Sequence, residues 1–175
     1  RKIITMGLAA IMAVSAMSIS AFAANIPMRS EVDTKAASAD NPVTYRTEDG
    51  IKITIYDPNI SLDFAEKEEP EIALANASGR VYIPNIQTGV GNKTNPFSAD
   101  GNSIVKFGLS IWEGGPKYNV ALYNSKNVCL AVAEDVPKSS EGTLDGTGSD
   151  GDYYFRVSTY YTAGNASYYA YTISK

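Results

Sequence analysis

The sequence predicts an all-β fold, an antiparallel β-sandwich of jelly-roll type. Short runs with apolar residues at alternate positions recur along the chain, as in Ile104 to Trp112 and in Tyr118 to Tyr123. Gly, Pro, Asn and Asp residues separate these runs, and no amphipathic helix of ordinary length is found between them. Strands that each bury one face need a second layer, which two packed sheets provide.

Residues 1–23 have the layout of a secretory signal peptide. Arg1-Lys2 is a positive start, Ile3 to Ile19 is an apolar core, and Ala21-Phe22-Ala23 ends in small residues suited to cleavage. We therefore expect a secreted protein, extracellular or at the cell surface. A transmembrane anchor is the alternative, but the core is short and dotted with Ser, and no further apolar run is long enough to span a bilayer.

The rest of the chain, residues 43–175, is expected to form a single β-sandwich domain. Residues 24–42 are rich in Ala, Ser and Asp without a sustained period, which predicts a flexible leader. Residues 43–56 predict a β-hairpin, because Asp49-Gly50 is a strong turn signal followed by alternating Ile residues. We expect this hairpin to join the main sandwich, since an isolated hairpin is marginally stable.

Alternation and turn residues predict the later strands in order. They are expected near residues 62–65, 80–83, 104–112, 118–123, 128–132, 153–161 and 168–173. Val128, Leu130 and Val132 are expected to continue the alternation in their strand. Residues 134–152 are expected to form a long polar loop.

Composition excludes several classes of function. The chain carries 15 basic and 19 acidic residues, and without residues 1–23 the balance is 13 against 19, a net charge of −6. Nucleic acid and anionic membrane surfaces require clustered Lys and Arg, so neither is an expected partner. The chain has no His and one Cys, which excludes a Ser-His-Asp triad, a Cys-His dyad and a His-bearing zinc site. Cys129 is expected to be a buried small hydrophobe, with an exposed thiol as the alternative.

Residues 66–174 resemble the bacterial pre-peptidase C-terminal domain family, a family of secreted β-sandwiches usually appended to peptidases. The similar segments are EKEEP at residues 66–70, KYNVALYNSKN at 117–127, GDYYFRV at 151–157 and YAYTI at 169–173. The chain departs from the family pattern at residues 102–107, where NSIVKF replaces Asp-x-Asp-x-Tyr/Phe. The resemblance implies a β-sandwich, and some relatives bind calcium near the acidic start of the domain.

Two acidic segments are candidate calcium sites, because carboxylates and backbone carbonyls supply the oxygens that calcium takes. Asp145, Asp150 and Asp152 lie in a glycine-rich run. Glu66 and Glu68 are candidates through the family resemblance. The alternative for both segments is a solvated polar loop.

Tyrosines in the last two strands form a candidate binding surface. Alternation assigns Tyr153, Phe155 and Val157 to the core and Tyr154 to the outer face. The outer surface is then expected to gather Tyr154, Tyr160, Tyr168 and, from an earlier strand, Trp112. The resemblance implies the same use, because collagen-binding members of that family bind through surface tyrosines. The alternative is that cross-strand tyrosine pairs only stabilise a sheet.

These observations predict a secreted, non-catalytic module that binds an extracellular or cell-surface polymer, a polysaccharide or a protein, through a tyrosine-rich sheet face. The first alternative is a structural or protein-interaction accessory subunit of the cell envelope. The second is a glycoside hydrolase that uses carboxylates such as Glu134 and Asp135 with Asp152. Calcium is the only cofactor that the sequence suggests.

Overall fold

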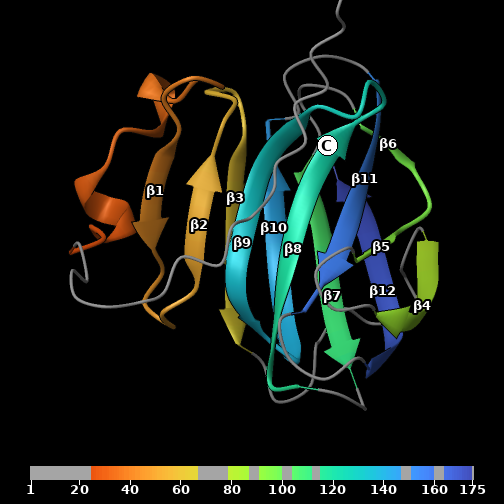
Figure 1. Ribbon diagram of the computed structural model, residues 1–175. Coiled ribbons are helices and arrows are strands. Elements are labelled where there is room, and N and C mark those ends of the chain that lie inside the picture. Colours follow the sequence, from red (N-terminus) through yellow and green to blue (C-terminus); the bar gives the residue numbers. More distant parts are fainter. Residues whose placement is uncertain are drawn as a thin grey trace, which may run out of the picture.

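The computed structural model describes residues 25–66, 79–86, 91–99, 104–111, 115–146, 151–159 and 164–174. Two antiparallel sheets pack face to face, so the predicted all-β sandwich is confirmed (Figure 1). The described residues include two short 3-10 turns and no α-helix. No helix among them is both long and apolar enough to cross a membrane.

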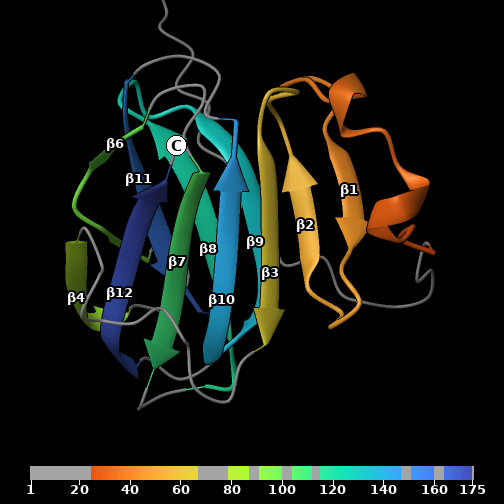
Figure 2. The ribbon, with the colours of Figure 1, turned by 180° about the vertical axis from the view of Figure 1, so that it is seen from behind.

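The two sheets have seven and five strands. The larger sheet runs in the order β1 (Val43–Arg46), β2 (Lys52–Ile55), β9 (Cys129–Pro137), β8 (Lys117–Asn124), β11 (Gly151–Ser158) and β5 (Asn92–Lys93), and β6 (Phe97–Ala99) also pairs with β11. The smaller sheet runs in the order β3 (Ser61–Glu66), β10 (Ser139–Asp145), β7 (Ile104–Ile111), β12 (Gly164–Ser174) and β4 (Gly79–Ile86) (Figure 2).

The connectivity is that of a jelly roll. The chain passes from one sheet to the other at seven of its connections, namely β2–β3, β4–β5, β6–β7, β7–β8, β9–β10, β10–β11 and β11–β12. The four-strand sets β4-β12-β7-β10 and β5/β6-β11-β8-β9 therefore face each other as two interlocked Greek keys. The hairpin of β1 and β2 extends the larger sheet beside β9, and β3 extends the smaller sheet beside β10 (Figures 1 and 2).

Residues 25–42, where we expected a flexible leader, lie against the hairpin. The backbone N–H of Arg46 donates to the carbonyl of Pro27 at 2.9 Å, and 3-10 turns follow at Arg29–Glu31 and Thr34–Ala36. Ala37 is buried in the hydrophobic core. The backbone bond to Arg46 and the burial of Ala37 anchor the segment, and a composition rich in Ala and Ser does not reveal such contacts.

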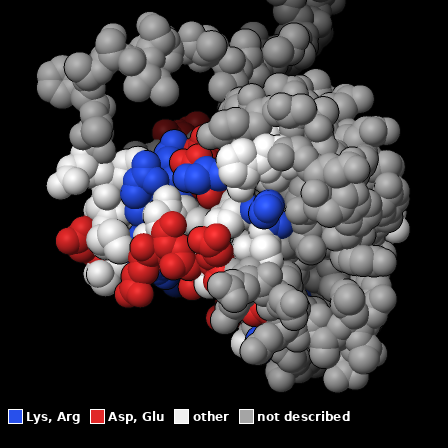
Figure 3. Space-filling view, turned by 90° about the horizontal axis from the view of Figure 1, so that it is seen from below, with Lys and Arg blue, Asp and Glu red and all other residues white. Residues whose placement is uncertain are grey.

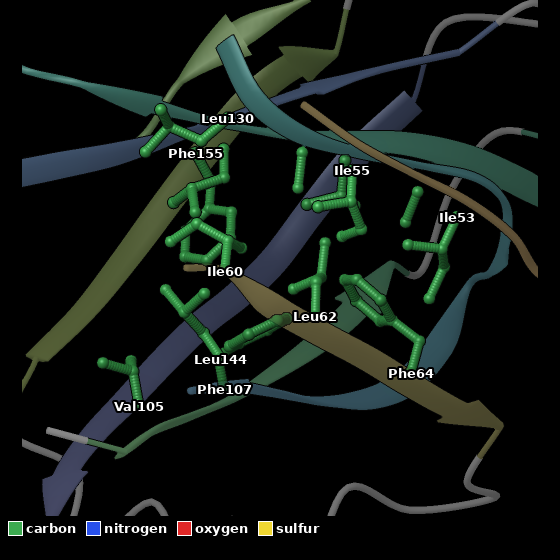
Figure 4. Close-up of a cluster of buried hydrophobic side chains, with 14 of the residues drawn as sticks. Ile53, Ile55, Ile60, Leu62, Phe64, Val105, Phe107, Leu130, Leu144 and Phe155 are labelled. Atoms are coloured by element: carbon green, nitrogen blue, oxygen red, sulfur yellow. The ribbon is translucent and has the colours of Figure 1, made fainter. Parts of the chain in front are cut away.

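Aliphatic and phenylalanine side chains fill the space between the sheets (Figure 4). The Phe107 ring lies 5.0 Å from the Phe64 ring and 4.8 Å from the Phe155 ring, measured between centroids. Phe155 also stacks on Phe97 at 5.3 Å. Tyr45 ends this core with its hydroxyl donating to the Leu62 carbonyl at 2.7 Å, and burial raises the pKa of Tyr45 to about 12. Burying a tyrosine costs little free energy when its hydroxyl makes a hydrogen bond.

Two expectations from alternation were wrong. Residues 139–145 form β10 inside the expected polar loop, because Ser140, Gly142 and Leu144 make a buried face that is small and only partly apolar. In β9 the buried residues after Leu130 are Ala131, Ala133 and Val136, and Val128 is 48% exposed. Register shifts in the β8–β9 ladder produce this change of face.

Candidate binding surface on the seven-stranded sheet

The predicted outer residues of β11 do lie on the outside of the seven-stranded sheet. Phe155 and Val157 are fully buried, so Tyr154 and Arg156 are directed away from the core. In the neighbouring strands, Tyr123 of β8 is the cross-strand partner of Tyr154, and Lys93 of β5 is the partner of Arg156.

Tyr123 and Tyr154 form a stacked pair, which we call the tyrosine pair. Their ring centroids are 5.3 Å apart and their planes differ by 6°. From the strand on the other side of β11, the Lys93 amine lies 4.6 Å from the Tyr154 centroid. Tyr154 is consequently only 9% exposed, so it contributes to the surface mainly through its edge and hydroxyl rather than an open ring face.

A hydrogen-bond network holds the pair in place. The Tyr154 hydroxyl donates to Asn127 Oδ1 at 2.9 Å, and Lys93 Nζ donates to the same oxygen at 3.3 Å. Asn127 lies in the β8–β9 turn with φ of 61°, a conformation that Asn adopts more readily than most residues. Asn124 Oδ1 braces this turn by accepting from the backbone N–H groups of Lys126 and Val128, each at 3.0 Å.

The surface continues from the tyrosine pair across β9. Cys129 is the cross-strand partner of Tyr123, and Tyr56 follows β2 with its N–H donating to the Leu130 carbonyl at 2.9 Å. Burial is the main cause that raises the pKa of both Tyr123 and Tyr56, and proximity to Cys129 adds to it. A row of side chains therefore crosses four strands, from Tyr56 through Cys129 and Tyr123 to Tyr154.

Cys129 is predicted to be an unreactive thiol. Burial raises the pKa of the Cys129 thiol to about 11, while hydrogen bonds with Tyr123 and the Ala131 carbonyl act in the opposite direction. At about pH 8 the thiolate fraction is then on the order of one in a thousand. We expect modification by a disulfide reagent to be slow and to accelerate about tenfold per pH unit up to about pH 10. The same protein unfolded in urea is the control, and a folded-state rate that levels off near pH 8.5 would contradict the prediction.

The structure places Tyr168 in the other sheet from Tyr154. Tyr168 lies on β12, which belongs to the five-stranded sheet, whereas Tyr154 lies on β11 in the opposite sheet. The expected sheet face shared by the last two strands is therefore absent, because the chain crosses between sheets after β11. Tyr160 and Trp112 lie outside the described residues.

The structure describes three of the five predicted calcium ligands, Asp145 and Asp152 of one candidate site and Glu66 of the other. Asp145 ends β10 opposite Ser61, while Glu66 lies at the other end of that ladder opposite Ser140. Asp152 is the second residue of β11 and accepts a hydrogen bond from the Ser98 hydroxyl. Asp150 and Glu68 fall outside the described residues. In the part of the chain that the structure describes, no three His, Cys, Asp or Glu residues gather as a metal site would need.

The carboxylates considered for hydrolysis do not face one another. Glu134 is paired with Lys52 at 2.5 Å, and Asp135 has φ of 64° at an irregularity in β9. The strand register puts Asp152 about six residues further along β8 than Glu134, which is roughly 20 Å. Paired carboxylates in glycosidases are about 5–9.5 Å apart, so Glu134 and Asp152 do not form such a pair.

A groove of about 460 Å³ lies between the N-terminal segment, the β1–β2 turn and β3. The groove is lined by both basic and acidic side chains. Two of them make hydrogen bonds to the backbone: Arg46 Nη1 donates to the Gly50 carbonyl, and Asp49 Oδ2 accepts from the Glu66 N–H. The view from below likewise shows basic and acidic side chains side by side on the described surface (Figure 3). Positive and negative side chains are therefore mixed in this groove, which does not favour a ligand of either charge.

Comparison with known proteins finds no counterpart for this chain. No family model matches it, and neither the curated proteins nor the solved structures contain a match. The candidate surface therefore stands on its own geometry.

Sequence reasoning named Tyr154 but missed three residues around it. Tyr123 was detectable as the outward neighbour of Leu122, whereas Lys93 and Asn127 lie between the strands that alternation predicts. Only the pairing of β5, β8 and β11 shows that these side chains meet.

Proposed function

We propose that this protein is a secreted, non-catalytic binding module that recognises an extended extracellular or cell-surface polymer. The tyrosine pair on the outer face of the seven-stranded sheet, with Lys93 and Arg156 beside it, is the observation that supports the proposal. Tyrosine combines a rigid apolar body with a polar tip, which suits contact with sugar rings or with a protein chain.

The shape of the surface favours an extended ligand over a small one. β8 and β11 are eight residues each, roughly 27 Å long, so their outer faces offer a length that an extended ligand can follow. The row from Tyr56 to Tyr154 runs across the strands, so a linear polymer that follows this row would contact several side chains in turn.

We also propose that the chain is related to the pre-peptidase C-terminal family and that calcium binds near Asp145 to Asp152.

A protein partner is the second candidate. Tyr and Arg are the residue types enriched at the centres of protein interfaces, and here they are adjacent. An accessory subunit of an envelope assembly would use the same surface. The two candidates differ in whether an isolated polymer binds without any other protein.

The test is cosedimentation of residues 24–175 with peptidoglycan, collagen, cellulose, chitin and mucin, each with calcium and with a chelator. We expect retention on at least one polymer and a loss of affinity of about tenfold or more in Tyr123→Ala, because removing a central aromatic contact in an interface has effects of that size. Tyr154→Phe keeps the stack and loses the bond to Asn127, so its loss should be smaller.

Lys106→Ala is the matched control, since it removes an exposed side chain from β7 of the five-stranded sheet, away from this surface. Circular dichroism and the urea midpoint show whether each variant is folded. Absence of retention on every polymer would exclude polymer binding and leave the protein partner. Retention that disappears with chelator would support a calcium site.

A further inference from the structure

We propose that the polymer is an acidic polysaccharide and that Lys93 and Arg156 bind its sugar carboxylates beside the tyrosine pair. The inference rests on the proposed function and specifies its ligand class. Four observations carry it, from residues of β5, β8, β11 and the β8–β9 turn and from the charge of the whole chain.

The first observation is a pair of like charges. Lys93 and Arg156 are direct cross-strand partners, and both are on the outer face, because the adjacent Thr94 and Val157 are buried. Like charges placed directly opposite each other destabilise a sheet. The same face shows the usual arrangement elsewhere, where Lys52 is opposite Glu134 and forms an ion pair with it.

The second observation is that no carboxylate of the described chain neutralises this pair. The described contacts of Lys93 are the Asn127 amide oxygen and the Tyr154 ring. The guanidinium carbon of Arg156 lies 5.6 Å from the Tyr123 ring centroid, and its Nε is buried with no hydrogen-bond partner among the described residues. A buried donor without a partner is unfavourable, and a ligand oxygen would satisfy it once the guanidinium lifts from the ring.

The third observation is the geometry of the donors. An arginine fork binds a carboxylate through two parallel N–H groups, commonly including Nε, and a neighbouring lysine adds a point charge. The small side chain of Ala121, the partner of Arg156 in β8, leaves the guanidinium space to move across the sheet. Asn127 accepts from both Lys93 and Tyr154, so the cation and the ring keep a fixed relation.

The fourth observation is the setting of the pair. The tyrosine pair beside the cations supplies apolar edge and hydroxyl groups for a sugar ring, which a simple anion does not use. The chain as a whole is acidic, with a net charge of −4, so the pair is a local feature and not part of a basic field. Polyanions without a sugar ring should therefore bind poorly.

The experiment measures binding of polygalacturonate by calorimetry at about 0.15 M salt, with fully methyl-esterified polygalacturonate and polyglutamate as matched probes. We expect polygalacturonate to bind at least tenfold more tightly than either. Arg156→Gln and Lys93→Gln should each weaken binding about tenfold or more, because each removes a charge-assisted contact. Lys106→Gln is the control, since Lys106 is exposed on the five-stranded sheet.

Each of the following outcomes would contradict the inference. Equal binding of the esterified polymer would show a neutral ligand, and equal binding of polyglutamate would show an acidic protein chain; both leave polymer binding in place. An effect of Arg156→Gln no larger than that of Lys106→Gln would exclude the cation pair. Absence of binding to these probes together with retention on a neutral polymer in the cosedimentation panel overturns the ligand class alone. Absence in both experiments overturns the proposed function as well.

Discussion

Phe107→Ala is expected to lower the free energy of unfolding by about 3–5 kcal/mol, the usual effect of removing a buried phenylalanine ring. Phe107 is fully buried, and its ring contacts Phe64 from β3 and Phe155 from the opposite sheet. The ring therefore joins the two layers, and the cavity left by alanine is walled by strands from both sheets. A domain of this size has a total stability of only about 5–15 kcal/mol, so the variant would be close to unfolding at physiological temperature.

Urea unfolding followed by tyrosine fluorescence and circular dichroism measures this effect. Phe107→Leu should lose less, because leucine refills part of the volume. Val128→Ala is the surface control, since Val128 is 48% exposed and its loss should change stability by less than about 0.5 kcal/mol. A loss below about 1 kcal/mol in Phe107→Ala would contradict the central role of this ring.

Gly142→Ala is expected to lower the free energy of unfolding by about 1–3 kcal/mol, the effect of overpacking a filled core. Gly142 of β10 is the cross-strand partner of Phe64 on one side and Phe107 on the other. The two rings meet edge to face at 5.0 Å over this residue, although their strands are not neighbours. A Cβ at Gly142 would overlap the Phe107 ring, so the ring would have to move.

Two further variants separate this steric effect from the general effect of glycine in a strand. Gly151 of β11 has open space where a Cβ would lie, so Gly151→Ala should be neutral or stabilise by up to about 1 kcal/mol. Phe107→Leu combined with Gly142→Ala should lose less than the sum of the single changes, because the smaller side chain makes room for the methyl group. Strict additivity would show that the methyl group does not act through Phe107.

The candidate surface shows which kinds of contact a sequence predicts. Alternation correctly placed Tyr154 outside and Phe155 inside, because successive side chains of a strand point to opposite faces whatever the partner strands are. It failed for Tyr168, because alternation carries no information about sheet membership. It also failed in β9, where an irregularity in the ladder exchanges the two faces.

The sequence by itself determined that this chain is a β protein, where most strands lie, that the β1–β2 turn is at Asp49-Gly50, and that the core is built from aromatic and aliphatic residues. These are local properties, set by turn conformations and by side chains that alternate every second residue. The tertiary structure decided that β11 and β12 belong to opposite sheets, that Gly142 seats two rings, and that Lys93 stands beside Arg156. Those contacts join residues far apart in the chain, because many neighbouring strands in the sheets of a jelly roll are not consecutive in sequence.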